Sequence, residues 1–205
     1  MIVGLGNPGP RYENTRHNIG WLILDELADQ WNATPYQNRF KADCASARFD
    51  GESVILLKPQ TFMNLSGDSV LPASSFYKVG LDHLIVIHDD IDLDLAQLKM
   101  KVGGGHGGHN GIRHIASRLG PNFTRVRAGV GRPSGQQGVS NFVLGQFQDE
   151  ESEQLSALLK NGSQATETLI KEGLKAAQLR FHTRPQKKKP KKPSKESEDQ
   201  SKNSS

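Results

Sequence analysis

The alternation of apolar and polar residues along this chain predicts a mixture of strands and helices. Apolar runs or period-two alternation predict strands at Ile2–Leu5, Ala42–Phe49, Val54–Lys58, Leu84–Ile87, Leu98–Val102 and Arg125–Gly131. Helical spacing predicts helices at Asn18–Trp31, Asn110–Leu119, Glu151–Leu159, Gln164–Leu179 and in part of Leu65–Val79. Pro72 should bend or interrupt the last of these, and Asn110 should be an N-cap. The mixture indicates a single α/β domain with a mixed sheet.

The composition changes abruptly near residue 183. From Thr183 onward the chain carries eight Lys or Arg and three acidic residues, and it has no apolar residue other than proline after Arg184. Because nothing there can offset the entropy of ordering, we expect a folded domain at residues 1–183 and a disordered lysine-rich tail at 184–205. The tail would be a tether for RNA or for an acidic surface, or simply a solubilising segment.

The sequence favours a cytoplasmic protein. It has no apolar stretch of membrane-spanning length, and its first residues lack the basic and apolar regions of a secretion signal. Cys44 is the only cysteine, so no disulfide can form within the chain.

The basic residues of the folded part are unevenly distributed. Between Asp94 and Asp149 there is no acidic residue, whereas seven basic residues occur: Lys99, Lys101, Arg113, Arg118, Arg125, Arg127 and Arg132. A solvated face normally mixes the two signs, so this stretch predicts an anionic partner, either nucleic acid or another phosphate ligand.

Two segments are rich in glycine. Residues 103–111 contain six glycines together with His106, His109 and Asn110, which favours close approach to a ligand over a plain surface loop. Residues 4–9 fit the dinucleotide pattern G-x-G-x-x-G, but Pro8 and Pro10 follow where a helix should open. We therefore interpret this segment as a turn that holds Asn7 over the end of a strand.

Acid–base residues follow a predicted buried strand at His88-Asp89-Asp90. Ligands bind at the carboxyl ends of such strands, and a carboxylate there can orient an imidazole. No G-x-S-x-G motif is present, so this pairing would activate water. A zinc or manganese site built from His106, His109 and these three residues is the alternative, but the two histidines lie among glycines rather than on a helix, and we expect no metal.

Three asparagines fall at strand-to-helix junctions. The amides of Asn7, Asn64 and Asn110 can donate and accept hydrogen bonds, as a peptide-like substrate requires. His17 precedes a predicted helix, where a capping role is also possible.

Together these motifs resemble those of the bacterial-type peptidyl-tRNA hydrolases. The motifs are VGLGNPG at Val3–Gly9, TRHNIG at Thr15–Gly20, KPQTFMNLSG at Lys58–Gly67, the acidic pair after HLIVIH, and GGGHGGHNGIRHI at Gly103–Ile115. The resemblance implies a compact domain whose twisted mixed sheet is packed by helices on both faces. It also implies hydrolysis of the ester that joins a peptide to tRNA, which recycles tRNA from peptidyl-tRNA released prematurely from ribosomes, without a cofactor.

The resemblance assigns roles to individual residues. His17 would be the general base and Asp89 its orienting carboxylate, while Asn7, Asn64 and Asn110 would position peptide, carbonyl and water. Tyr12 and Met63 would line the substrate groove, and His109 would be auxiliary. Lys99, Lys101 and Arg127 would hold tRNA phosphates.

Some features depart from the family pattern, and two other functions remain open. Asp90 stands where many relatives carry Glu, Pro72 lies near the groove segment, and the tail is an addition. A non-catalytic RNA-binding module would keep the groove but lack the chemistry, and a metallohydrolase would be inhibited by chelators. No protein partner is implied, and a monomer is expected.

Overall fold

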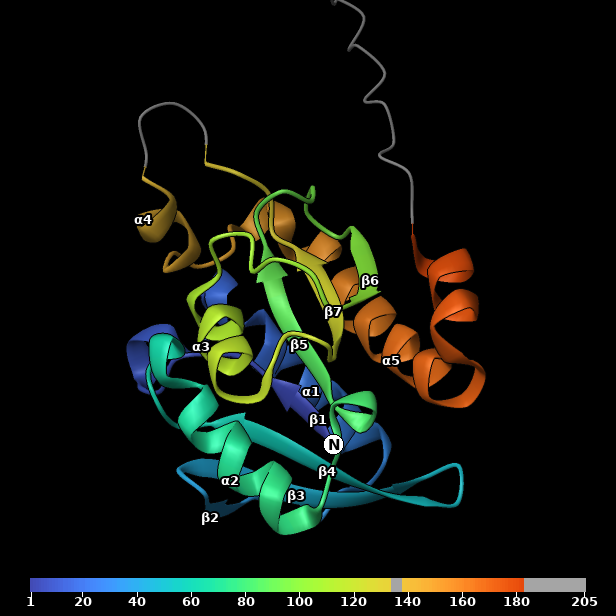
Figure 1. Cartoon of the computed structure of the whole chain (residues 1–205). Helices are drawn as coiled ribbons and strands as arrows, with labels where there is room; N and C mark the ends of the chain where they lie inside the picture. The colour runs from blue at the N-terminus through green and yellow to red at the C-terminus, as the bar shows by residue number, and fades with distance from the viewer. Residues whose placement is uncertain (134–137, 183–205) are drawn as a thin grey trace, which may run out of the picture.

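The computed structural model describes residues 1–133 and 138–182, which form one seven-stranded sheet flanked by helices (Figure 1). The strands are β1 (Ile2–Gly4), β2 (Gln37–Arg39), β3 (Ala42–Phe49), β4 (Glu52–Pro59), β5 (Ile85–Asp90), β6 (Leu98–Val102) and β7 (Thr124–Gly129). The helices are α1 (Ile19–Gln30), α2 (Gly67–Tyr77), α3 (Asn110–Leu119), α4 (Val139–Val143) and α5 (Ser152–Phe181), with 3₁₀ turns that include η2 (Arg16–Asn18) and η3 (Met63–Leu65).

The sheet is mixed, as the sequence predicts. Its strand order is β2-β3-β4-β1-β5-β7-β6. The neighbours β4, β1, β5 and β7 pair in parallel, whereas β2, β3 and β6 are joined antiparallel. The carboxyl ends of the four parallel strands therefore meet at one edge, which is where an α/β sheet places its ligand.

Helices bury an apolar core on each face of the sheet. On one face α1 and α5 pack on residues that include Ile2, Leu56, Ile87, Met100 and Val126. On the other face α2 and α3 pack on residues that include Val3, Leu57, Val86 and Phe123. Successive residues of β1 and β5 thus enter opposite cores, so these strands are buried on both sides. The expected layering is confirmed.

Two helix predictions were wrong in detail. Helix α2 continues through Pro72, which is exposed and lies within the second turn, so proline does not interrupt it. Helix α5 runs through residues 160–163, where a gap between two helices was expected. Gly162 lies there because a Cβ would approach the Ile23 side chain of α1 to within 2.7 Å. The true break lies at Gly173, with φ 83° and ψ 177°.

Other differences lie at the ends of elements. Strand β5 extends through His88, Asp89 and Asp90, so the acid–base residues are part of the strand rather than of the loop after it. The sequence pattern did not predict the short β2 or α4. None of the described helices combines the length and apolar character of a membrane span. The tail prediction at residues 184–205 lies outside the described residues.

Candidate active site

Two histidines converge on one buried carboxylate at the carboxyl edge of the sheet. Asp89 lies near the end of β5, His17 lies in η2 before α1, and His109 immediately precedes α3. His17 Nδ1 is 2.7 Å from Asp89 Oδ1, and His109 Nε2 is 2.9 Å from the same oxygen. Three separate elements thus bring together residues that the sequence proposed for one site.

The contacts of His109 define its tautomer. Its Nδ1 accepts the backbone N–H groups of Gly111 at 3.1 Å and of Ile112 at 3.3 Å. That nitrogen therefore carries no proton, and Nε2–H donates to Asp89. His109, not Asn110, is the N-cap of α3, so the predicted cap was one residue too late.

The same carboxylate orients His17. An ionised Asp89 accepts hydrogen bonds only, so His17 Nδ1–H donates to it and the other ring nitrogen, Nε2, is left as the basic atom. His17 lines a cavity of about 520 Å³. Its free nitrogen is the chemical group that a general base requires.

Charge interactions affect the pKa values of Asp89 and His17 more strongly than burial does. Burial alone would raise the pKa of Asp89, but the two imidazoles and their hydrogen bonds hold it far below its ordinary value. Burial would lower the pKa of His17, but the Asp89 charge and hydrogen bond raise it above its usual value. Asp89 thus stays ionised and stabilises a proton on His17.

A third histidine fixes the backbone next to the pair. His88 is buried, and its Nδ1 lies 2.7 Å from the Asp89 carbonyl oxygen, to which it donates. Burial, followed by the proximity of His109, lowers the pKa of His88 well below its ordinary value, so the ring is neutral. The sequence pattern grouped His88 with the acid–base residues at the end of its strand and with possible metal ligands, and it gave no sign of this backbone contact.

Asn7 is held by three hydrogen bonds. Its Oδ1 accepts the N–H of Met63 at 2.8 Å, which ties the β1 turn to η3. Asn18, fully buried, accepts from the Asn7 N–H at 2.8 Å and donates to the Asn7 carbonyl at 3.0 Å. The predicted turn over the strand end is therefore confirmed, and the Asn7 amide nitrogen remains to donate to a ligand. Sequence reasoning missed Asn18, although it adjoins His17.

Most of the predicted site residues line the cavity. They are Asn7, His17, Met63, Asn64, Asp89, His109 and Asn110. Met63 is buried, whereas Asn64 and Asn110 are exposed at its rim. Tyr12 does not line it, and the Arg11 guanidinium carbon lies over its ring, 4.5 Å from the ring centroid. Three exposed apolar side chains of the lining, Phe62, Val139 and Leu144, offer contact to an apolar or peptide-like ligand.

Known proteins are similar to this chain over most of its length. A family model described as peptidyl-tRNA hydrolase matches residues 1–191. The chain is 47% identical to a peptidyl-tRNA hydrolase from Bdellovibrio bacteriovorus, covering 89% of this chain and 99% of that protein.

The chain belongs to the peptidyl-tRNA hydrolase family.

Further relatives extend the match to the structure. A family member from Citrifermentans bemidjiense is 48% identical over 90% of this chain and 98% of that protein. The crystal structure of peptidyl-tRNA hydrolase from Acinetobacter baumannii superposes with a TM-score of 0.83 at 37% identity, covering 88% of this chain and 93% of that chain.

In this member of the family, some basic side chains of the acid-free stretch bond to groups within the fold, and others are available to bind a ligand. Arg125 is buried, and its guanidinium donates to the carbonyls of Gly104 at 2.8 Å and Gly105 at 2.7 Å. The glycine-rich segment is thus held at its start. Ion pairs occupy Arg118 with Asp68, Arg127 with Asp90, and Arg132 with Asp92. The stretch holds seven basic residues, but within residues 1–133 and 138–182 only three of them, Lys99, Lys101 and Arg113, form neither an ion pair nor a side-chain hydrogen bond.

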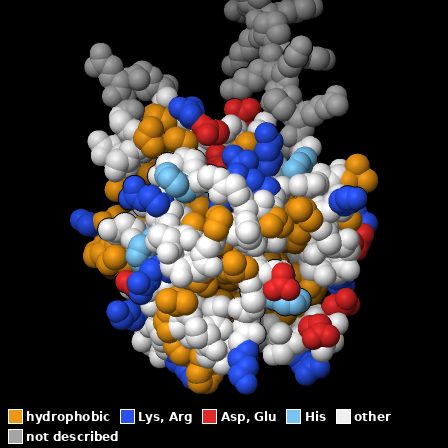
Figure 2. Space-filling view, viewed as in Figure 1, with side chains coloured by type: hydrophobic (Ala, Val, Ile, Leu, Met, Phe, Trp, Pro, Cys, Tyr) orange, Lys and Arg blue, Asp and Glu red, His pale blue; other side chains and the backbone are white. Residues whose placement is uncertain are grey.

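Figure 2 shows Lys and Arg side chains gathered over the upper ends of β6 and β7, with acidic side chains beside them. Lys99 of β6 lies directly opposite Arg127 of β7. Partial burial, followed by the charges of Arg127 and Arg125, lowers the pKa of Lys101. Like charges opposite one another are unfavourable, and the Asp90 carboxylate that pairs with Arg127 offsets part of this repulsion.

The donor set of the His17, Asp89 and His109 cluster does not suit a metal. His17, Asp89 and His109 lie close enough to hold an ion. However, His109 Nδ1 accepts two backbone N–H groups, so its Nε2 carries the proton and has no lone pair for a metal. Nor do the previously considered His88 and His106 join this cluster.

Proposed function

We propose that this chain hydrolyses the ester between a peptide and the 3′ ribose of tRNA in peptidyl-tRNA released prematurely from ribosomes. The observation that carries the proposal is the 2.7 Å contact between His17 and Asp89 at the wall of the cavity. The relatives named above are peptidyl-tRNA hydrolases, which supports the same substrate here.

In the proposed mechanism, His17 Nε2 takes a proton from a water molecule as that water attacks the ester carbonyl carbon. Asp89 stabilises the imidazolium that forms. The tetrahedral intermediate then collapses, the bond to the ribose oxygen breaks, and His17 returns the proton to that oxygen. The products are tRNA with an intact 3′ ribose and a free peptide acid, which loses its proton to solvent and becomes a carboxylate.

The amides would position the substrate. Asn7 would donate from its free amide nitrogen, and Asn64 would bind the peptide backbone at the cavity rim. Asn110 begins α3, so its amide and the positive end of the helix would stabilise the developing oxyanion. Met63 would contact the peptide, and His109 would keep Asp89 ionised and correctly oriented.

The tRNA body would bind through phosphates. Lys99 and Lys101 supply positive charge and form no ion pair with the residues that the structure describes, and Arg127 adds a guanidinium that Asp90 orients at 2.7 Å. Such contacts position a nucleic acid without reading its sequence. Tyr12, outside the cavity, would contact tRNA or peptide beyond the reacting ester. We place this activity in the cytoplasm, on a monomer that needs no cofactor.

Release of labelled peptide from peptidyl-tRNA by the full chain tests the proposal. Wild-type protein should release peptide at catalytic concentrations, and addition of a metal chelator should leave the rate unchanged. Tight tRNA binding without release would identify a non-catalytic RNA-binding module instead. Loss of release with chelator, restored by zinc or manganese, would identify a metallohydrolase.

A further inference from the structure

The end of α5 makes an unusual contact with the exposed edge of the sheet. β6 is the last strand in the sheet order, so no strand among the described residues pairs with the outer side of its backbone. At Met100 two side chains of the C-terminal segment fill that place. Gln178 Nε2 donates to the Met100 carbonyl at 2.9 Å, and the Met100 N–H donates to His182 Nε2 at 2.8 Å.

These two bonds satisfy both backbone polar groups that Met100 would otherwise present to solvent or to another strand at the sheet edge. Met100 is the middle residue of β6, and Lys99 and Lys101 lie on either side of it. In the strand register these two lysines lie opposite Arg127 and Arg125 of β7. The Met100 side chain enters the core with α5, whereas Lys101 and the exposed Lys99 project from the opposite face.

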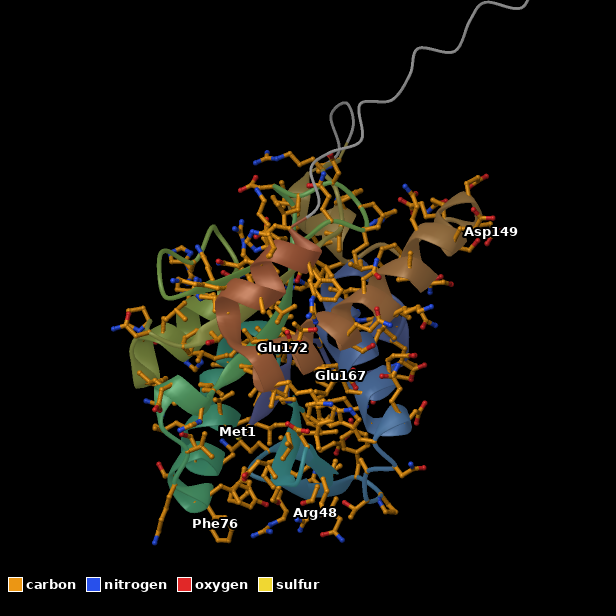
Figure 3. All side chains as sticks on the ribbon, turned by 90° about the vertical axis from the view of Figure 1, so that its right-hand side faces the viewer. Met1, Arg48, Phe76, Asp149, Glu167 and Glu172 are labelled. Carbon is orange, nitrogen blue, oxygen red and sulfur yellow. The ribbon has the colours of Figure 1, made fainter. Side chains whose placement is uncertain are left out.

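The two hydrogen bonds that join Gln178 and His182 to Met100 form a clasp on β6. The position of this clasp depends on a bend in α5. Figure 3 shows Glu172 where the last segment of the helix departs from the longer one. Gly173 breaks the helix there, and Arg180 donates to both carboxylate oxygens of Glu172 across the break, at 2.6 and 2.8 Å. Ala177 is fully buried against the core, so the segment packs closely on the fold and presents Gln178 and His182 to β6.

We propose that Gln178 and His182 are positioning residues for tRNA binding, because they clamp the edge of β6 and so hold Lys99 and Lys101 in place for phosphate. This rests on the proposed function, since it assigns a role in the same substrate's binding. The residues touch β6, not the reacting atoms. Their loss should therefore weaken binding of the tRNA body and leave the chemical step unchanged.

The test compares the full chain with the Gln178→Ala/His182→Ala variant on three probes: deacylated tRNA, peptidyl-tRNA, and a peptidyl ester of adenosine that lacks the tRNA body. The double variant should bind deacylated tRNA about three- to tenfold more weakly, as expected when one or two hydrogen bonds are removed. KM for peptidyl-tRNA should rise by a similar factor while kcat stays unchanged. Turnover of the adenosine ester should not change.

Two further variants separate positioning from general damage. Leu179→Ala is the matched control, because Leu179 lies on the same turn with 88% of its surface exposed, and it should behave as wild type. His182→Gln retains an acceptor for the Met100 N–H and should restore most of the affinity. If the double variant unfolds, Gln178→Ala alone provides the same comparison.

A double-mutant cycle decides whether the effect passes through the lysines. In a Lys99→Ala/Lys101→Ala background, removal of Gln178 and His182 should cause little further decrease in tRNA affinity. Full additivity, or unchanged affinity in the double variant with both lysines present, would overturn the proposal. Absence of peptide release by the wild type, with the weaker tRNA binding of the variant still present, would refute the hydrolase function but not the clasp.

Discussion

His17 and Asp89 are 72 positions apart in the chain, yet His17 Nδ1 lies 2.7 Å from Asp89 Oδ1. His109 donates to the same oxygen from a third element. The Asp89 carboxylate is therefore shared by two histidines. The tautomer of His109 is fixed by the N-terminus of α3, whereas His17 keeps its Nε2 free. This arrangement assigns different roles to two histidines that the sequence alone makes look alike.

Replacing His17 by alanine should remove the general base. We expect kcat for peptidyl-tRNA to fall about a hundred- to ten-thousandfold, the usual contribution of such a group. The Kd for deacylated tRNA should change little, because the proposed phosphate-binding side chains lie on β6 and β7. Single-turnover peptide release together with tRNA binding checks both parts. Wild-type turnover in this variant would remove His17 from the mechanism.

The pH dependence of kcat should follow His17. The reaction needs neutral His17, and Asp89 raises its pKa, so activity should fall as pH drops through that raised pKa. Asp89→Asn removes the charge, so the acid limb should move to lower pH and the maximal rate should also fall. A pH–rate profile of both proteins measures this. An acid limb that stays in place in Asp89→Asn would contradict the assignment.

Asn18→Ala should disturb both stability and the site. It leaves the buried N–H and carbonyl of Asn7 without partners, at a cost of about 2–4 kcal/mol in the free energy of unfolding. Asn18→Asp retains the acceptor for the Asn7 N–H and should lose less. Chemical denaturation measures the loss of stability, and kcat of the folded fraction measures the disturbance of the site. A fully active, fully stable Asn18→Ala would show that Asn7 needs no such support.

Gly173→Ala tests the bend in α5. The backbone there, at φ 83° and ψ 177°, is accessible essentially to glycine alone, so alanine should destabilise the fold by about 1–3 kcal/mol. Gly138→Ala is the control, since Gly138 has φ −66° and a Cβ placed there meets no atom of the described residues within 4 Å. Thermal unfolding of both variants provides the comparison. Equal melting temperatures would show that the bend adapts without strain.

Deletion of residues 185–205 tests the lysine-rich tail as an RNA tether. If the tail binds tRNA phosphates, the slope of log K against log salt should flatten by about one for each phosphate that the shortened chain no longer neutralises. Turnover of the adenosine ester should stay the same. An unchanged slope would leave the tail a solubilising segment.

The sequence by itself determined the elements and the family. The spacing of apolar residues located most strands and helices, because it shows which side of an element is buried. Five separated motifs placed His17, Asp89, His109 and the three asparagines in one candidate site. The acid-free stretch pointed to an anionic partner, although it overstated the number of available charges.

Only the tertiary structure decided which of these groups touch. Arg125 and Arg127 alternate with apolar residues on one strand, and nothing local shows that Arg125 is buried under glycine carbonyls while Arg127 pairs with Asp90. Likewise, the N-cap role of His109, the support of Asn7 by Asn18, and the clasp on β6 all join residues from different elements. Hydrogen bonds depend on distance and direction in space, and a one-dimensional pattern records neither.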